Sequence, residues 1–204
     1  IDIPSDWRNR FESIGIEVVA PSDLSEMAGQ DAVLLVDGYH LADLTDITEE
    51  FRAKVGIDDF GLGKFGHGLD LVIDQSLPPS AELPISYRAA GRVLRGQRYV
   101  MLRPDLEAGP SRPSTQNCPR ILVSLGGHPS GSVRSWAEDV LSQLDPNIRP
   151  LWLLGVENVG DVMSRTDIAL AAAGSTTWEL CRFGVPGLYI SLSLNQDHML
   201  GTIA

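Results

Sequence analysis

The stretch DIALAAAGSTTWELCRFGVP, residues 167–186, decides the fold class of this chain. An apolar run leads into Gly-Ser-Thr-Thr, a segment with helical spacing follows, and Gly184 and Pro186 end that segment. A second apolar run, residues 187–192, comes directly afterwards. The order strand, tight turn, helix, strand is typical of a parallel α/β unit.

The turn in this stretch is a candidate site for a phosphate group. Small hydroxyl residues stand where the helix begins, and the unpaired backbone N–H groups and the dipole of a helix start favour an anion. Glu179 lies one turn further in, where a carboxylate can hold the vicinal hydroxyls of a ribose. Together these features indicate a nucleotide site. The alternative is a Ser175 that only caps the helix and a Glu179 that is solvated, and the spacing alone leaves both open.

Composition limits the class of protein. The 204 residues, 43% of them hydrophobic, are enough for one large or two small domains, and the net charge of -11 argues against a nucleic-acid surface. The apolar runs are too short for membrane insertion, and the first residues show no signal-peptide pattern. Cys118 and Cys181 lack metal-ligand spacing, and isolated thiols are typical of a reducing cytoplasm. We expect a cytoplasmic protein that needs neither metal nor cofactor.

Strand-like and helix-like segments alternate along the chain, which predicts mostly parallel sheets. Residues 103–119 are dense in Pro, Ser and Gly and predict a linker. We therefore expect an α/β protein with a Rossmann-like domain over residues 1–102 and a nucleotide-binding Rossmann-like domain over residues 120–204. Short connections near residues 61–68 and 154–155 indicate a fragment, or a chain without some of its loops.

The expected elements of the first half are short. Helices are predicted at residues 22–28 and 44–53, and strands at residues 16–20, 31–37, 54–60, 69–75 and 98–102. The apolar run at 31–37 is continuous and bounded by acids, which is typical of a strand buried on both faces. In the second half, strands are expected at residues 120–124, 150–154, 167–173 and 187–193, with helices around Trp136, at 159–165, at 176–183 and after Asn195.

Three turns of the second half directly follow expected strands, and the carboxyl ends of parallel strands meet at one edge of a sheet. Glycines there allow close approach of backbone to a ligand, and side-chain amides suit sugar hydroxyls. The candidate binding residues of these turns, besides Glu179, are Gly126, Gly127, His128, Gly174, Ser175, Thr176, Thr177, Asn195 and Gln196. Structural alternatives stay open: Gly126 and Gly127 can form a simple tight turn, His128 can be a surface histidine, and Asn195 can cap a helix.

Acids and a tyrosine end the strands of the first half. Asp37, Tyr39 and His40 follow the run at 31–37, where an Asp and a Tyr can point into a cleft. Asp58 and Asp59 end another strand. Paired carboxylates there can act as acid–base groups or bind a cation. The alternative is that Asp58 caps a turn and Asp59 is solvated. GxSxG, HExxH, P-loop and acid-followed GxGxxG motifs are absent, so serine-hydrolase, zinc-protease, kinase-type-NTPase and dinucleotide-oxidoreductase interpretations lose their main support.

The order of several segments resembles a known family, the nucleotide-sugar hydrolases of pseudaminic acid biosynthesis with the related spore-coat polysaccharide proteins. The segments are VDGYHL (36–41), IDDF (57–60), LVIDQSL (71–77), YVMLRPDL (99–106), ILVSLGG (121–127), MSRTDIALAAAGSTTWELCRFGVP (163–186) and SLNQD (193–197). The resemblance implies a GT-B fold, in which two Rossmann-like domains face each other across a cleft. It also implies that water displaces UDP from a diacetamido-trideoxy sugar with inversion.

Matching positions imply roles for individual residues. The turn 174–177 would hold the pyrophosphate and Glu179 the ribose hydroxyls. Gly126 and Gly127 would lie along the diphosphate, and Asn195 and Gln196 would lie towards the sugar. Tyr39, in the strand-end element with Asp37, would line the catalytic side of the cleft.

The sequence departs from the family at one point. The GxGHxxR element, whose histidine is the expected base for water, is not among the 204 residues. Either such an element precedes Ile1 or the protein binds a nucleotide sugar without hydrolysing it efficiently. Two other functions therefore stay open: a GT-B glycosyltransferase that uses a UDP-sugar donor, and a non-catalytic nucleotide-sugar-binding module.

Overall fold

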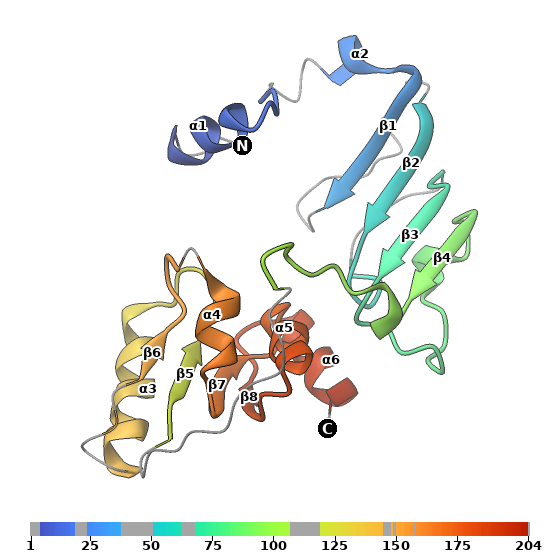
Figure 1. Ribbon diagram of the computed structural model, residues 1–204. Helices are drawn as coiled ribbons and strands as arrows, with labels where there is room; N and C mark the ends of the chain where they lie inside the picture. The colour runs from blue at the N-terminus through green and yellow to red at the C-terminus, as the bar shows by residue number, and fades with distance from the viewer. Residues whose placement is uncertain are drawn as a thin grey trace. The chain divides into compact units, whose positions relative to one another are not determined.

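A computed structural model describes residues 5–18, 24–37, 51–62, 68–106, 119–144, 148, 150–156 and 158–203 (Figure 1). The chain divides into two compact units. The first unit comprises Ile1–Asp58, Gly63–Ile73 and Ile85–Val93, and the second comprises Asp59–Leu62, Asp74–Pro84 and Leu94–Ala204. The domain boundaries expected from the sequence stay a prediction.

The first sheet has the strand order β1-β2-β3-β4. Its strands are β1 (Gly29–Asp37), β2 (Phe51–Ile57), β3 (Leu71–Asp74) and β4 (Arg92–Arg95). Parallel pairing places Asp37 beside Ile57 and Ile57 beside Ile73, so three strands end at the same edge. The other described elements of this half are α1 (Ser5–Ser13), α2 (Leu24–Met27) and the 3-10 turns η3 (Ile85–Tyr87) and η4 (Gln97–Tyr99).

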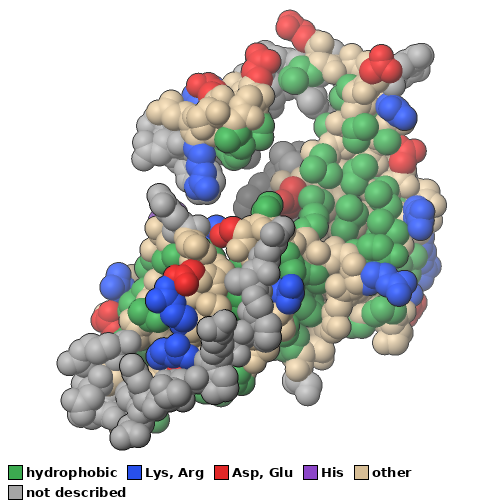
Figure 2. Space-filling model, viewed as in Figure 1, with side chains coloured by type: hydrophobic (Ala, Val, Ile, Leu, Met, Phe, Trp, Pro, Cys, Tyr) green, Lys and Arg blue, Asp and Glu red, His purple; other side chains and the backbone are tan. Residues whose placement is uncertain are grey.

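One face of β1 is open to solvent, so the expectation of a strand buried on both faces is wrong. Val33 is 56% exposed and Leu35 is 59% exposed, whereas Val36 is buried. Figure 2 shows apolar side chains gathered over the strands of the first sheet. A continuous apolar run therefore predicts the strand itself, but it does not say which faces another element covers.

The second sheet has the order β6-β5-β7-β8, and all of its pairings are parallel. Its strands are β5 (Ile121–Ser124), β6 (Leu151–Trp152), β7 (Ile168–Ala172) and β8 (Gly187–Ile190), and its helices are α3 (Gly131–Leu144), α4 (Val159–Ser164), α5 (Thr176–Phe183) and α6 (Leu194–Ile203). From β5 the chain moves outward to β6 and then crosses back to β7 on the other side of β5. The strand order therefore reverses between β5 and β7, as in doubly wound α/β sheets.

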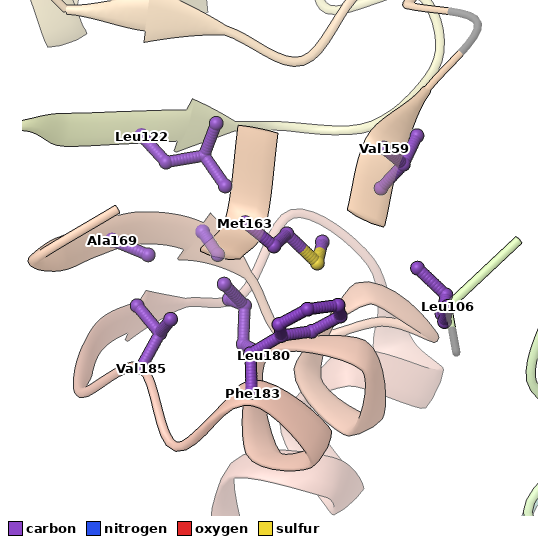
Figure 3. Packing of buried hydrophobic residues seen from close by; sticks show 9 residues of the cluster. Leu106, Leu122, Val159, Met163, Ala169, Leu180, Phe183 and Val185 are labelled. Atoms are coloured by element: carbon purple, nitrogen blue, oxygen red, sulfur yellow. The ribbon is translucent and has the colours of Figure 1, made fainter. Parts of the chain in front are cut away.

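Helices cover both faces of the second sheet because successive residues of β5 point in opposite directions. Leu122 packs with Met163 of α4 and Leu180 of α5 (Figure 3). Val123 packs on the opposite side with Leu141 of α3. All four residues of β5 are buried, which explains why their sequence is uninterruptedly apolar apart from the terminal serine. The predicted α/β class with parallel sheets is confirmed.

An ion pair fixes the beginnings of the two central strands. The backbone N–H, Nε and Nη2 of Arg120 donate to the Asp167 carboxylate at 2.7, 3.0 and 2.9 Å. The side-chain hydrogen bond to Asp167 raises the pKa of Arg120. With the strands aligned in this way, Ser124 pairs with Ala171, so β5 and β7 also end at the same level.

Three expected elements of the first half are wrong in their described parts. Residues 16–18 form no strand, and residues 51–53 begin β2 where a helix was expected. Residues 98–102 contain the end of a 3-10 turn, whereas the strand β4 lies earlier and was not predicted. β4 has only four residues with arginine at each end, which gives no clear alternation. Residues 19–20 and 44–50 lie outside the described part.

The start of the expected linker packs on the second unit. Leu106 is 3% exposed and belongs to the cluster that contains Val159 and Phe183. A Cβ atom on Gly160 would lie 2.6 Å from the backbone oxygen of Asp105, a distance that no rotamer change can relieve. The segment 103–106 therefore sits directly against the backbone of α4.

Replacing Gly160 by Ala is expected to destabilise the protein by about 1–3 kcal/mol, because overpacking forces a backbone shift. Gly131→Ala is the matched control, since nothing lies within 4 Å of a Cβ atom at that position. The control should be neutral or slightly stabilising, as a glycine-to-alanine change in a compatible backbone restricts the unfolded chain. Urea unfolding measures both changes, and equal stabilities for the two variants would contradict the close approach at Gly160.

Candidate functional site

The candidate site lies where β5, β7 and β8 end. Ser124 pairs with Ala171, and Ala172 pairs with Ile190, so the turns that follow these strands leave the sheet at one edge. The reversal of strand order falls between β5 and β7, and ligands of open α/β sheets bind at that point. The structure therefore brings the three predicted turns of the second half to a common edge.

The first turn of α5 offers backbone donors to a ligand. The N–H groups of Thr177 and Trp178 already donate to the carbonyls of Gly174 and Ser175, at 3.0 Å each. The N–H groups of Ser175 and Thr176 make no hydrogen bond to any residue that the structure describes. Unpaired amides at a helix start are the groups that bind phosphate.

Ser175 does not cap α5 through its side chain. It has helical backbone angles, its side chain makes no capping hydrogen bond, and it is exposed. The capping alternative left open by the sequence is therefore not what the structure shows. The Ser175 hydroxyl lies beside the two unpaired amides, where it can donate to the same ligand.

The other hydroxyls of this turn are more enclosed. Thr176 Oγ1 lies 3.5 Å from Ser124 Oγ, which links the start of α5 to the end of β5. Thr177 is 1% exposed, and its hydroxyl has no hydrogen-bond partner within the described part of the chain. Of the four residues in the predicted turn, Thr177 is thus the one turned into the protein.

The turn after β5 is open. Gly126 has a φ of +92°, which favours glycine, and nothing lies within 4 Å of a Cβ atom at Gly126 or Gly127. His128 follows and is exposed. A ligand at the end of β5 can therefore reach this backbone without displacing a side chain.

The turn after β8 presents an amide to the α5 turn. Gln196 Oε1 accepts a hydrogen bond of 2.7 Å from the Leu192 N–H, and its Nε2 lies 3.8 Å from the position of a Cβ atom on Gly174. Asn195 Oδ1 accepts a bond of 2.6 Å from the Ser193 hydroxyl. Asn195 lies within α6 and does not precede it, so the expected alternative of helix capping by Asn195 does not apply.

Glu179 is half-buried, which argues against a merely solvated acid. Burial raises the pKa of its carboxyl, the charge of Arg103 lowers this pKa, and the charge of Asp105 raises it. A carboxylate at a sheet edge with a pKa perturbed by burial and by specific charges is a candidate functional group. The alternative in which Glu179 is merely solvated therefore does not describe this carboxylate.

Sequence reasoning missed Arg103 and Asp105, because both fell in the expected linker. Arg103 Nε and Nη2 donate to the two Asp105 carboxylate oxygens at 2.9 Å each. The only available signal was the segment YVMLRPDL, which contains both residues but suggested no role for them.

Of the first-half candidates, Asp37 is the last residue of β1 and is exposed, while Tyr39 and His40 lie outside the described residues. Asp58 is buried, and Asp59 accepts a bond of 2.9 Å from the Ser76 hydroxyl, so Asp59 is not simply solvated. Within the described ranges, no group of three or more His, Cys, Asp or Glu residues is placed to hold a metal ion.

The fold and this edge define an α/β protein with two four-stranded sheets and a candidate ligand site at the strand reversal of the second. No known family model and no curated protein matches the chain. Among the described residues, none of the helices has the length and apolar character to cross a bilayer.

Proposed function

We propose that this chain binds a UDP-linked sugar and is part of a GT-B-type nucleotide-sugar hydrolase. Its substrate would be a UDP-linked diacetamido-trideoxy sugar of bacterial surface-polysaccharide or flagellin-glycan biosynthesis. In the reaction, water attacks the anomeric carbon, the bond to the UDP oxygen breaks, and UDP leaves with the electron pair. The sequence resemblance suggests the sugar and the reaction, and the α5 turn supports the nucleotide.

One observation carries the proposal. The unpaired N–H groups of Ser175 and Thr176 lie at the β5/β7 reversal, and half-buried Glu179 lies one turn along the same helix. The separation along the axis is about 4.5–6 Å, because an α-helix rises about 1.5 Å per residue. Phosphate at the amides and ribose hydroxyls at the carboxylate fit this order, and preorganised N–H groups also stabilise the charge of a departing diphosphate.

The other predicted residues have compatible positions in the proposal. Gly126 and Gly127 would lie along the diphosphate, and Gln196 beside Gly174 would lie towards the sugar with Asn195. Tyr39 and Asp37 would act on the catalytic side.

Titration calorimetry with UDP tests whether the chain binds the nucleotide. GDP is the comparison ligand, because it shares the diphosphate and the ribose with UDP. Hydrolysis is tested with the full gene product and UDP-sugars without an acceptor. Free sugar formation supports the hydrolase. Strict dependence on an acceptor would identify a glycosyltransferase, and UDP binding without any turnover would identify a binding module.

Replacing Tyr39 by Phe is expected to reduce turnover much more than UDP affinity. The reason is that the proposal places its hydroxyl beside the reacting sugar and away from the nucleotide. Steady-state kinetics and UDP calorimetry on the same variant separate the two effects. Equal losses in both would mark Tyr39 as a packing residue.

A further inference from the structure

The loop after β2 contains a residue in a backbone conformation that its side chain disfavours. Phe60 has a φ of +55°, and in the described part of the chain it is the only residue other than glycine with a positive φ. Gly61 follows with a φ of +76°, and the Leu62 N–H donates to the Asp59 carbonyl at 3.0 Å. Positive φ at both central positions is the signature of a type I′ turn, in which the first central position is normally Asn, Asp or Gly. A phenylalanine at that position is strained.

A buried carboxyl group holds this turn in place. The Phe60 N–H donates to Asp74 Oδ2 at 2.7 Å. The other oxygen, Oδ1, accepts from the N–H groups of Ser76 and Leu77 at 3.0 and 2.9 Å. Asp74 is 0% exposed, so these bonds are shielded from water. The Ser76 hydroxyl also donates to Asp59 at 2.9 Å. Fixed contacts therefore maintain the strained conformation of Phe60.

The Phe60 ring packs on the two helices that border the candidate site, and its loop belongs to the same compact unit as these helices. The buried cluster that it contacts consists of Ala173, Trp178 and Met199. Ala173 directly precedes the turn 174–177, and Trp178 directly follows it. Met199 lies on α6. Phe60 therefore supports the turn from outside the segment that forms it.

The same ring contacts the part of α6 that presents an amide to the turn. The rings of Phe60 and His198 have centroids 5.2 Å apart and an interplanar angle of 30°. Gln196 lies two residues before His198 on this helix. Its Oε1 accepts from the Leu192 N–H, and its Nε2 lies 3.8 Å from the position of a Cβ atom on Gly174. The position of this amide therefore depends on where the first turns of α6 lie, which the Phe60 ring helps to fix.

We propose that Phe60 is a positioning residue for Gln196. Its strained turn holds the ring against α6, and the ring keeps the Gln196 amide where it can donate to a ligand on the α5 turn. The inference rests on the proposed function for the identity of that ligand, a UDP-linked sugar. Glycine or asparagine would form the same turn with less strain. The turn itself thus gives no reason for an aromatic side chain, whereas the contacts with α5 and α6 do.

Three substitutions separate the ring from the backbone of the turn. Phe60→Gly favours the turn and removes the ring, so the protein should stay folded while α6 loses this contact. Phe60→Leu keeps apolar bulk without a flat ring, and Phe60→Tyr keeps the ring. Trp152→Leu is the matched control, because Trp152 is also a half-buried aromatic residue of this unit but packs on the α3 side of the second sheet.

The first measurement is NMR of the Gln196 side-chain amide and of the His198 ring in the protein without ligand. Both sets of signals should move in Phe60→Gly and Phe60→Leu. They should stay near their parent positions in Phe60→Tyr and Trp152→Leu.

The second measurement is titration calorimetry with UDP and with UDP-N-acetylglucosamine, a UDP-linked acetamido sugar. In Phe60→Gly we expect the Kd of the UDP-sugar to rise about 2- to 30-fold, the range for changes that act on a site through packed side chains. The Kd of UDP should rise less, because backbone N–H groups of the α5 turn hold the phosphates in the proposal. Phe60→Tyr should restore the parent affinity.

The two measurements separate this inference from the proposed function. If the Gln196 signals move in Phe60→Gly but not in Phe60→Tyr, and the parent binds neither UDP nor the UDP-sugar, the positioning of Gln196 is upheld and the nucleotide is overturned. Unmoved signals in Phe60→Gly would overturn the positioning role, whether or not UDP binds. Equal movement in Trp152→Leu would also overturn it, because it would show a general loosening of the unit. Moved signals with an unchanged Kd for a UDP-sugar that the parent binds would overturn the role of Phe60 in the site.

Discussion

Leu180→Ala is expected to lower the free energy of unfolding by about 2–5 kcal/mol, the range for truncating a buried leucine. Leu180 is 0% exposed and lies in the cluster with Leu122, Met163 and Val185 (Figure 3). The loss combines the removed apolar area with a cavity that the sheet below and α4 cannot fill. Because Leu180 follows Glu179 directly, the same change loosens the helix that carries the candidate site.

Leu144→Ala is the matched control, because Leu144 also lies on a helix but is 70% exposed. Its effect should stay within about 0.5 kcal/mol, as for most surface substitutions. Urea unfolding with and without UDP measures both variants. A ligand that binds only the folded state at 100 times its Kd should return about 2.7 kcal/mol to either variant. Equal losses in the two leucine variants would contradict the described core.

The second sheet could be predicted from the sequence because local and long-range signals agree. The apolar runs of β5 and β7 are buried on both faces, and clear stop signals separate them from the helices. The predicted helix at residues 176–183 coincides with α5, which ends at Gly184 with a φ of +66°. In this part of the chain, the strand or helix preference of each segment agrees with its position and burial in the fold.

The first sheet was harder, for a physical reason. The apolar residues of β2 (FRAKVGI) are interrupted by arginine and lysine, and β4 (RVLR) has only two apolar residues between arginines, so the hydrophobic period of both strands is weak. Burial in these strands comes from their neighbours, and a single sequence does not show which neighbours those are. The exposure of Val33 and Leu35 could not be predicted for the same reason, because the sequence of β1 does not show which of its faces a neighbouring element covers.

The candidate site was predictable where it depends on a turn and unpredictable where it depends on a distant segment. Gly174, Ser175 and Glu179 follow from one local pattern, strand then turn then helix. Arg103 and Asp105 reach the same helix from more than 70 residues earlier in the chain, through the buried contact of Leu106. Residues 103–106 show no hydrophobic periodicity that would predict the contact of Leu106 with α5.

Glu179→Gln is expected to weaken UDP binding and to stabilise the protein without ligand. UDP affinity should fall by about 1–3 kcal/mol, because the ionised carboxylate is replaced by a neutral group with one acceptor oxygen. The pKa of Glu179 is raised in the folded state, mainly by burial, so the folded protein favours its protonated form. The stability linked to this proton is present at acid pH and is lost as pH rises through the titration of Glu179.

The variant should therefore be more stable than the parent at neutral pH, and the difference should vanish in acid, where both side chains are neutral. Thermal unfolding across that range and UDP calorimetry measure the two effects. Glu138→Gln, at an exposed position of α3, is the control and should leave UDP affinity unchanged. An unchanged affinity in Glu179→Gln would remove Glu179 from the site.

This experiment is informative because Glu179→Gln is expected to weaken UDP binding and, at the same time, to stabilise the protein without ligand. If Glu179 served only for packing or for a surface ion pair, its replacement would destabilise the protein and would have no defined effect on UDP affinity. A half-buried carboxylate whose neutral replacement stabilises the protein but weakens UDP binding would instead be a candidate ligand-binding group. If Glu179→Gln instead loses stability at neutral pH, burial is not the dominant influence on Glu179, and its assignment to the ribose hydroxyls loses its electrostatic support.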